Sequence, residues 1–417
     1  MSGVTTNADP SPAATASRRG VLAQLRPTPR FGWLMAVYLV AAVSVGARET
    51  VRVDYASETL NGELGVGVVA VVFAISLALG SVMNGRRVDA HDARPVLIVG
   101  TVASALLQGV NAVILLRGPM PLGWLIASTA IEAALFGILA TSLLKVQAAI
   151  VQPGTQGAAE TVSIVRSGIG MAIGAVLAGF IGDPVVTQFV TASLTLGVAL
   201  AAAVVVWPVT MPTVSQTSIS ISEVVDVVRS SGALHRTVTV DLILAFVLPT
   251  QFIALALADQ DEPELVSLAF AASLLGVLVG RLALMSTGIR GNLARRLTST
   301  YLAFTALTAF AAPALVGGWI LDQRVLVVAC PFVGSALLAY AQNLPIALIQ
   351  QQVPEHVRGS LSGFMQAARN LLIAGAAVGV TALTTIYSAS VLALAIAIML
   401  GVGFLVAGRF RGLVADP

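Results

Sequence analysis

Long apolar stretches, separated by short polar or Gly- and Pro-containing segments, follow one another along most of this chain. Each stretch is close to the roughly 20 residues that a helix needs to cross about 30 Å of hydrocarbon. The predicted membrane-spanning helices, twelve in all, are 31–50, 65–84, 96–116, 121–144, 162–182, 187–208, 238–258, 265–287, 298–321, 325–349, 362–386 and 388–408.

The apolar pattern also excludes the other architecture that spans membranes. Strands of a membrane barrel alternate apolar and polar residues, whereas runs such as 68–75 are continuously apolar. Backbone polar groups in lipid must bond within their own segment, which leaves helices. A content of 57% hydrophobic and 10% charged residues fits the same class. We therefore predict an all-α polytopic membrane protein.

The basic residues predict how the helices are oriented. With the amino terminus in the cytoplasm, 19 of the 23 Lys and Arg residues fall on the cytoplasmic side. Arg48, Arg52, Arg117 and Arg324 fall on the other side. An even number of crossings then places both termini in the cytoplasm. This sidedness accounts for the net charge of +3, and the sparse, mixed charges predict no nucleic-acid partner.

A polar stretch in the middle of the chain predicts two six-helix bundles. The amino-terminal segment is rich in Ala, Ser, Thr and Pro, so we expect a disordered tail there. Within the central loop, residues 219–229 could form a short amphipathic helix on the cytoplasmic surface. The predicted division is a tail at 1–30, a bundle at 31–209, a central loop at 210–236, a second bundle at 237–408 and a tail at 409–417.

Two short patterns recur in the second half and indicate a duplication. Gly85-Arg86, at the end of the second predicted helix, recurs as Gly280-Arg281 near the end of the eighth. The segment 153–166, with a proline, a glycine and an arginine, has a counterpart at 354–369. Repeats of this size are typical of transporters that rock one half against the other around a site at the membrane midplane.

The loop after the second predicted helix, 85–97, resembles the signature of the major facilitator superfamily, and the resemblance extends over 31–408. The family pattern is a glycine, an aspartate four residues on, then a basic residue, a glycine and a basic pair. Gly85, Asp89 and Arg94 fit this pattern. The positions that depart from it are Ala90, Asp92 and Ala93.

In that family the loop holds the cytoplasmic side closed, so the resemblance implies that Gly85, Asp89 and Arg94 are gating residues. The partners we expect for this latch are Arg166 and the start of the eleventh predicted helix, near Ser360. Physically, Asp89 can accept from amides at a helix N-terminus and pair with an arginine. The alternative is that these charges only determine orientation, and it applies best to the arginine pair 86–87.

Glycines at four-residue spacing in the fifth and eleventh predicted helices predict close helix packing, at Gly170, Gly174, Gly375 and Gly379. The family's proton-coupled drug antiporters place a proline after a central glycine of the fifth helix. Here Ala175 follows Gly174.

The fourth predicted helix carries an acidic residue, Glu132, eleven residues from Pro121 and thus near mid-membrane. Many members of the family carry an arginine in this helix, which is absent here. An ionisable group at that depth is costly, and it is expected to face a cavity. Desolvation favours its neutral form, as suits a group that exchanges a proton or holds a cation. The alternative is a protonated carboxyl group that hydrogen-bonds between helices.

Other charged residues are candidates for binding the substrate or coupling protons. Arg48, Glu49 and Arg52 line the outer half of the cavity if the first helix extends beyond 31–50. If it does not, the two arginines are solvated and pair locally with Glu49 and Asp54.

Two candidates lie in the seventh predicted helix. Asp241 is near its cytoplasmic start and Gln251 near its middle, beside Pro249, which frees a backbone carbonyl. The amides Gln108 and Asn111 are further candidates, although single amides in helices most often bond to neighbouring helices.

No cofactor, metal or enzymatic site is predicted. Cys330 is the only cysteine, and His91, His235 and His356 lie in three different predicted loops. The chain's single lysine rules out a lysine-containing Gly-rich phosphate loop, and no convergent nucleophile, base or metal set is visible.

We therefore expect a secondary transporter that exports a small amphipathic or cationic organic molecule and is coupled to protons. The alternatives are an uptake or facilitated-diffusion carrier, and a transporter-like sensor or scaffold without transport. We expect a monomer whose partners are the small-molecule substrate, the lipid bilayer and protons. Because all but one of the 23 basic residues are arginine, we expect a high-GC bacterium and its cytoplasmic membrane.

Overall fold

The computed structural model describes residues 29–59, 63–90, 92–151, 156–211 and 221–247 and, beyond them, 272–273, 275–283, 325, 329, 332–337, 339–340, 361, 363–372 and 374–375. Within these ranges the secondary structure is helical, joined by short turns, and contains no strand. The predicted all-α class is therefore confirmed for this part of the chain. Both predicted tails, apart from Pro29 and Arg30, and two candidate residues, Gln251 and Gly379, lie outside the described residues.

Six long helices follow one another in the amino-terminal half: α3 (Pro29–Thr59), α4 (Glu63–Ala90), α5 (Ala93–Arg117), α6 (Leu122–Ile150), α7 (Gln156–Ile181) and α8 (Pro184–Val206). Five of them contain segments long and apolar enough to cross a membrane, and α4 contains a shorter one, Val68–Asn84. All six predicted helices of this half are thus present. The full set of twelve and the cytoplasmic placement of the termini stay predictions.

The predicted end of the first helix, residue 50, is wrong, because α3 continues to Thr59. The added residues include Arg52, whose charge made the apolar pattern end early. That side chain is only 7% exposed and pairs with carboxylates inside the protein, so its charge does not require the helix to leave the bundle there.

The outer face of the bundle is apolar. Phe180 is 85% exposed and Val204 is 77% exposed, and large aliphatic side chains are exposed along all six helices. Soluble monomers rarely expose so much contiguous apolar surface. Lipid is the medium in which this face is stable.

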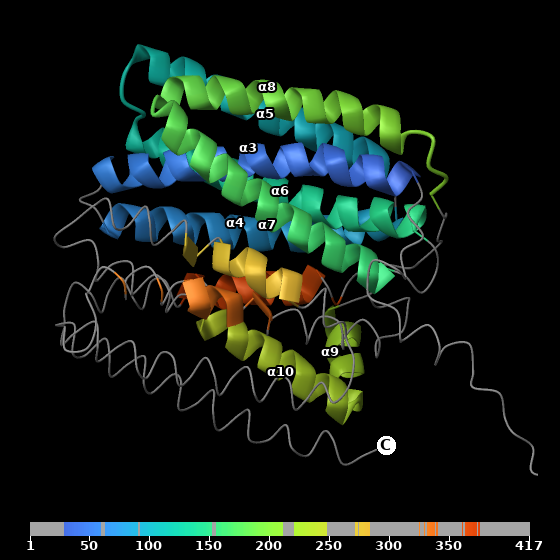
Figure 1. The fold of residues 1–417 in the computed structure, drawn as a ribbon. Coiled ribbons are helices and arrows are strands. Elements are labelled where there is room, and N and C mark those ends of the chain that lie inside the picture. Colours follow the sequence, from blue (N-terminus) through green and yellow to red (C-terminus); the bar gives the residue numbers. More distant parts are fainter. Residues whose placement is uncertain are drawn as a thin grey trace, which may run out of the picture.

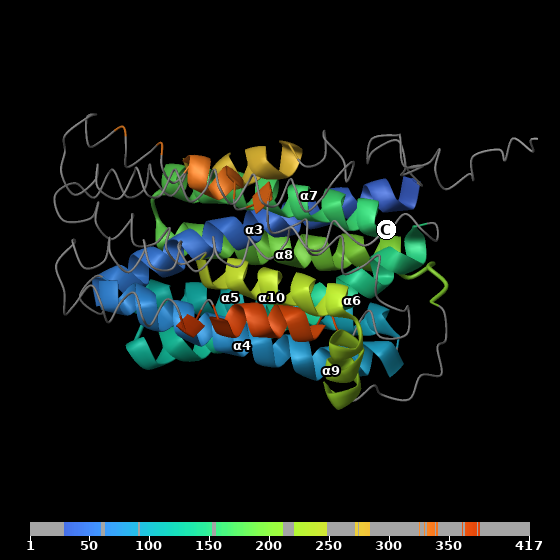
Figure 2. The ribbon, with the colours of Figure 1, turned by 90° about the horizontal axis from the view of Figure 1, so that it is seen from below.

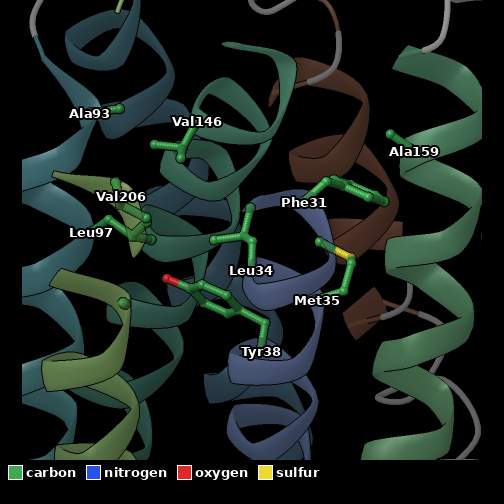
Figure 3. Close-up of a cluster of buried hydrophobic side chains, with 10 residues drawn as sticks. Phe31, Leu34, Met35, Tyr38, Ala93, Leu97, Val146, Ala159 and Val206 are labelled. Carbon is green, nitrogen blue, oxygen red and sulfur yellow. The ribbon is translucent and has the colours of Figure 1, made fainter. Parts of the chain in front are cut away.

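Separate apolar cores lie at the two ends of the bundle. At one end the starts of α3, α5 and α7 meet the ends of α6 and α8 (Figure 3). At the other, the ends of α3 and α5 meet the starts of α4 and α6. Successive helices therefore run in opposite directions, as successive membrane crossings require. The first core contains Phe31, Leu34, Met35, Tyr38, Ala93, Leu97, Val146, Ala159, Ala202 and Val206, and the second contains Ala56, Val69, Leu115, Met120 and Leu125.

A short helix, α9 (Ile221–Ser230), begins within the predicted central loop, and α10 (Gly232–Val247) follows it. The amphipathic helix predicted at 219–229 is therefore present. Its buried Val224 and Val228 pack against Leu234 and Val238 of α10 and against Leu361 and Met365. The apolar face of α9 thus lies against protein, and the membrane surface is not needed to cover it.

Segments of the second half lie along one side of the α3–α8 bundle, next to α4 and α7 (Figures 1 and 2). The Arg281 guanidinium donates from Nη1 to the Ile164 carbonyl of α7, at 2.8 Å. Gly363 lies against the Ser81 carbonyl of α4, with 3.8 Å from an added Cβ to that oxygen. These two contacts join residues that the sequence places at the cytoplasmic ends of their helices.

Close packing of α4 on α6 has a counterpart in the second half. Gly80 of α4 lies directly against the backbone of Ala134, and Gly137 of α6 lies against that of Leu77. Segment 275–283 packs in the same way on segment 332–337, where Gly276 and Gly280 lie against the backbone of Phe332 and Ala336. This is the packing that a duplicated six-helix unit would produce.

Candidate functional site

Four charged side chains from two helices meet in the interior of the amino-terminal bundle. Arg48, Glu49 and Arg52 come from α3, and Glu132 comes from α6. Arg48 Nη1 lies 2.6 Å from Glu132 Oε1, and Arg52 Nη2 forms an ion pair with Glu132 Oε2. Arg52 Nη1 also donates to both carboxylate oxygens of Glu49, at 2.7 and 2.8 Å. We call this group the arginine–glutamate cluster.

The cluster is enclosed by protein. Glu132 is 2% exposed, Arg48 is 5% exposed and Arg52 is 7% exposed, whereas Glu49 keeps 24% of its side chain exposed. The predicted alternative in which the two arginines are solvated is therefore wrong, because α3 continues past residue 50 and keeps both inside. Local pairing of Arg52 with Glu49 is present, but it accompanies the longer-range pairing with Glu132.

Two guanidinium groups face two carboxyl groups in the cluster, so its charges cancel when both carboxyl groups are ionised. Buried charges are tolerated when they are paired, and loss of one partner leaves another charge uncompensated. The ring of Phe73 on α4 lies beside Arg52, 5.8 Å from the centroid to Cζ, and adds a cation–π contact.

A chain of hydrogen bonds connects the cluster with α5 and α8. Arg48 Nη1 donates to Ser104 Oγ at 3.2 Å, and Gln108 Nε2 donates to the same oxygen at 3.1 Å. Thr195 Oγ1 donates to Gln108 Oε1 at 3.3 Å. Sequence reasoning named Gln108 but missed Ser104, since a serine within an apolar helix carries no signal of a charged partner.

Some polar groups around the cluster keep bonding capacity. Among the described residues, Arg48 Nε and Thr129 Oγ1 are buried without a hydrogen-bond partner. Glu132 Oε1 makes the ion-pair contact with Arg48 but no hydrogen bond in addition. The charges of the cluster are thus paired, while these two donor groups and this acceptor keep hydrogen-bonding capacity.

Asp241 belongs to a second polar group, which lies apart from the cluster and combines residues of both halves. Arg369 Nε donates to Asp241 Oδ2 at 2.6 Å, and Arg369 Nη2 bonds to the other carboxylate oxygen. Glu160 of α7 lies within electrostatic reach of Arg369. The group Glu160, Arg369 and Asp241 therefore links the two halves, and the structure places Asp241 away from Glu132.

Glu160 precedes the apolar segment of α7, Val162–Ile181. Burial raises its pKa to about 7, and the positive charge of Arg369 opposes that increase. A carboxyl group with a raised pKa stabilises the folded state in its protonated form. That stabilisation is complete below the ordinary pKa of 4.5 and is lost as the pH rises toward 7.

We expect the thermal midpoint of the purified protein to fall between pH 5 and pH 8, and Glu160→Gln to remove most of that fall. The energy involved is on the order of 2 kcal/mol, because one pKa unit corresponds to about 1.4 kcal/mol. Thermal unfolding in detergent over this pH range measures it. Glu223→Gln, a change at an exposed position of α9, is the matched control. If the thermal midpoints of the wild type and Glu160→Gln change with pH in the same way, the pH dependence does not come from Glu160.

Arg94, predicted as a gating residue, lies in the first turn of α5, beside the residues that follow α8. Its guanidinium binds both carboxylate oxygens of Asp92, and Nη1 donates to the carbonyls of Trp207 at 2.8 Å and Val209 at 2.7 Å. The ring of Trp207 lies 5.9 Å from Arg94 Cζ. In this conformation Arg94 fixes the end of α8 to the start of α5.

Asp92 supports this contact and caps α5, since its side chain accepts from the Arg94 amide at 3.0 Å. Hydrogen bonds from the Arg94 side chain hold the pKa of Asp92 below its usual range. A carboxylate with a lowered pKa stabilises the protein above its unfolded pKa, and this contribution is lost as the pH falls through the folded value.

We expect Asp92→Ala to cost at most about 1 kcal/mol, because the pair is well exposed and screened by solvent. The cost should begin to shrink as the pH falls below the ordinary carboxyl pKa, and it should vanish only as the pH passes through the lower folded pKa of Asp92. Thermal unfolding at several pH values measures it. Asp183→Ala is the control, since Asp183 caps α8 through the amides of Val185 and Val186 and forms no ion pair with an arginine of the described ranges. If Asp92→Ala and Asp183→Ala lower the stability equally at neutral pH, the contact with Arg94 adds nothing to the cap.

The other predicted gating residues are placed as follows. Arg166 lies over the Tyr38 ring, with Cζ 5.5 Å from the centroid, and its Nε and Nη1 have no hydrogen-bond partner among the described residues. Gly85 and Asp89 belong to the last turns of α4, where the structure describes the backbone but not the side chains.

The predicted packing glycines differ in their surroundings. An added Cβ on Gly170 would lie 2.8 Å from the Leu39 carbonyl, and Gly174 lies directly against the backbone of Val43. Both therefore sit where α7 crosses α3. No described atom lies within 4 Å of an added Cβ on Gly375.

The described residues contain no group of three His, Cys, Asp or Glu side chains that could hold a metal ion. The charged side chains described above form ion pairs. They form two groups: a buried arginine–glutamate cluster in the first half, and a second ionic group where the two halves meet.

Solved transporters share this fold. The human organic anion transporter MFSD10 superposes with a TM-score of 0.70 at 15% identity, covering 94% of this chain and 99% of that one. The Escherichia coli fucose:proton symporter FucP gives 0.68 at 12%, covering 94% and 99%. A bacterial homologue of the iron transporter ferroportin, in an outward-facing state, gives 0.68 at 14%, covering 92% and 99%. Likenesses at such low identity show the fold alone.

None of the curated proteins compared with the chain matches it in sequence. The sequence model that describes the Major Facilitator Superfamily matches residues 34–378. That match includes the whole arginine–glutamate cluster, both repeats of the loop pattern and the ionic group between the halves. The chain belongs to the Major Facilitator Superfamily.

Proposed function

We propose that this protein is a secondary active transporter that moves a small organic molecule out of the cell and couples the movement to protons through Glu132. The family and the fold are those of membrane transporters that work by alternating access. The coupling ion, the direction and the kind of solute are the parts that we propose.

The observation that carries the proposal is the burial of Glu132 between two arginines. A carboxyl group that is 2% exposed gains a proton only at the cost of its ion pairs, and it loses the proton only when those pairs form. Its charge is therefore tied to the conformation of α3 and α6. Such a tie is the physical requirement for coupling a proton to a conformational change.

The exposed aromatic residues support a solute other than a stacked sugar. Trp33 is 66% exposed and Trp207 is 64% exposed, both near helix ends, which suits the membrane interface. Trp124 donates from its indole nitrogen to Asn111 Oδ1 at 2.8 Å, and its role there is to join α6 to α5.

The test is an untargeted comparison of metabolites inside and outside cells that express the wild type, Glu132→Gln or an empty vector. We expect at least one compound to be enriched outside with the wild type and not with Glu132→Gln. A thermal-shift assay on the purified variant checks that it is folded. Enrichment inside would favour the uptake carrier, and redistribution that the variant leaves unchanged would assign Glu132 a packing role. No redistribution would favour the sensor or scaffold.

A further inference from the structure

The arginine–glutamate cluster has a charge balance that restricts what can bind beside it. With both carboxyl groups ionised, two positive and two negative charges cancel within a buried volume. One proton added to Glu132 leaves one positive charge in excess. An uncompensated buried charge is costly, so the protonated cluster has a physical need for one negative charge.

The positive groups can meet that need directly. Arg48 Nε is buried and has no hydrogen-bond partner among the described residues, and the Nη1 of Arg48 bonds to an uncharged acceptor, Ser104. A guanidinium carries five N–H donors in a planar fork that matches a carboxylate. When Glu132 is protonated, the donors that it held become free as well. Arg48 and Arg52 then offer a paired binding surface for an oxyanion.

Among the described residues, the charged groups that face Glu132 are Arg48 and Arg52, both from α3, with Glu49 beside Arg52. The contacts that α4 and α5 make with the arginines are uncharged, namely the Phe73 ring and the Ser104 hydroxyl. A cation entering this site would add to two existing positive charges. Repulsion by the arginines therefore disfavours a cationic solute.

We infer that the arginine–glutamate cluster binds one monovalent organic carboxylate together with one proton, the carboxylate on Arg48 and Arg52 and the proton on Glu132. This inference rests on the proposed transport function and names its substrate class. Binding of either partner favours binding of the other, by the reciprocity of linked equilibria. An organic acid that accumulates in the cell then leaves down its own gradient with its proton, and no net charge crosses the membrane.

The experiment uses the purified full chain in lipid nanodiscs and three probes of similar shape: benzoate, benzylamine and benzyl alcohol, with acetate and lactate as smaller carboxylates. Ligand binding is measured by the shift in thermal midpoint, and proton uptake by a pH indicator in weak buffer. We expect at least one carboxylate to stabilise the protein and to bring about one proton with it. Its apparent Kd should rise about tenfold per pH unit once Glu132 is deprotonated in the free protein.

Two variants identify the groups. Glu132→Gln keeps the positive excess permanently, so the carboxylate should bind without proton uptake and with little dependence on pH. Arg48→Gln should weaken carboxylate binding by at least tenfold, while Arg117→Gln, at an exposed arginine at the end of α5, should leave it unchanged.

Stabilisation by benzylamine and by no carboxylate would overturn the inference, as would carboxylate binding to the wild type without proton uptake or the absence of stabilisation by every carboxylate. If the metabolite comparison finds redistributed compounds that are cationic or uncharged, the substrate class fails while the transport function stands. If nothing is redistributed, the transport function itself fails.

Discussion

Glu132→Leu should destabilise the protein by about 3–5 kcal/mol, because it removes the carboxylate that two buried arginines share. Arg48 would then keep only a neutral partner, Ser104, and Arg52 would depend on Glu49. Thermal unfolding of the detergent-solubilised protein should show a lowered midpoint, and expression should fall with it. This is the largest effect expected from a single side chain of the cluster.

Glu49→Gln is the matched control for that result. Among the described residues Glu49 forms its ion pair with Arg52, and it keeps 24% of its side chain exposed, so water replaces part of the lost interaction. We expect a loss of at most about 1 kcal/mol. The double variant Arg48→Met with Glu132→Leu should recover part of the stability, because it removes one charge of each sign. Equal losses from Glu132→Leu and Glu49→Gln would show that burial does not determine the energetics of this cluster.

Gly174→Leu should prevent normal packing of the amino-terminal bundle. An added Cβ at this position would lie 2.7 Å from the Ala47 amide nitrogen and against the backbone of Val43. Overpacking by side chains typically costs about 1–3 kcal/mol, and here the obstacle is backbone that cannot change rotamer. We therefore expect a cost of at least about 3 kcal/mol, measured as a lower thermal midpoint and as aggregation in size-exclusion chromatography.

Gly179→Leu, on the same helix, is the control. No described atom lies within 4 Å of an added Cβ on Gly179, so a larger side chain there extends into open space. We expect this variant to unfold within about 0.5 kcal/mol of the wild type, as is usual for surface substitutions. Similar behaviour of the two leucine variants would show that the contact between α3 and α7 tolerates separation.

The continuous apolar runs predicted the helices of the first half correctly. A helix in lipid is stable when its surface is apolar, whichever other helices it contacts. The same criterion failed at the end of α3, where Arg52 is buried by its partners. The amphipathic pattern at 219–229 predicted a helix correctly, but it contained no information about what covers the apolar face. Leu361 and Met365, more than a hundred residues away, help to cover it.

Among the candidate residues, Glu132 and the arginines of α3 were each chosen for a separate reason, namely an ionisable group at depth and charges near a helix end. Sequence spacing could not show that they meet, because α3 and α6 are brought together by packing with α4, α5 and α7. Asp241 was grouped with them and lies elsewhere, paired with Arg369. Ser104, which has no distinguishing pattern in the sequence, completes the bonding of Arg48.

The sequence by itself determined the class of this protein and its first six helices, because both follow from the local match between apolar length and the bilayer. The tertiary structure decided which charges are partners. A buried ion pair depends on the separation of side chains from helices far apart in the chain, and only packing fixes that separation. The balance of charge around Glu132, and with it the kind of solute that we expect, is therefore a property of the fold.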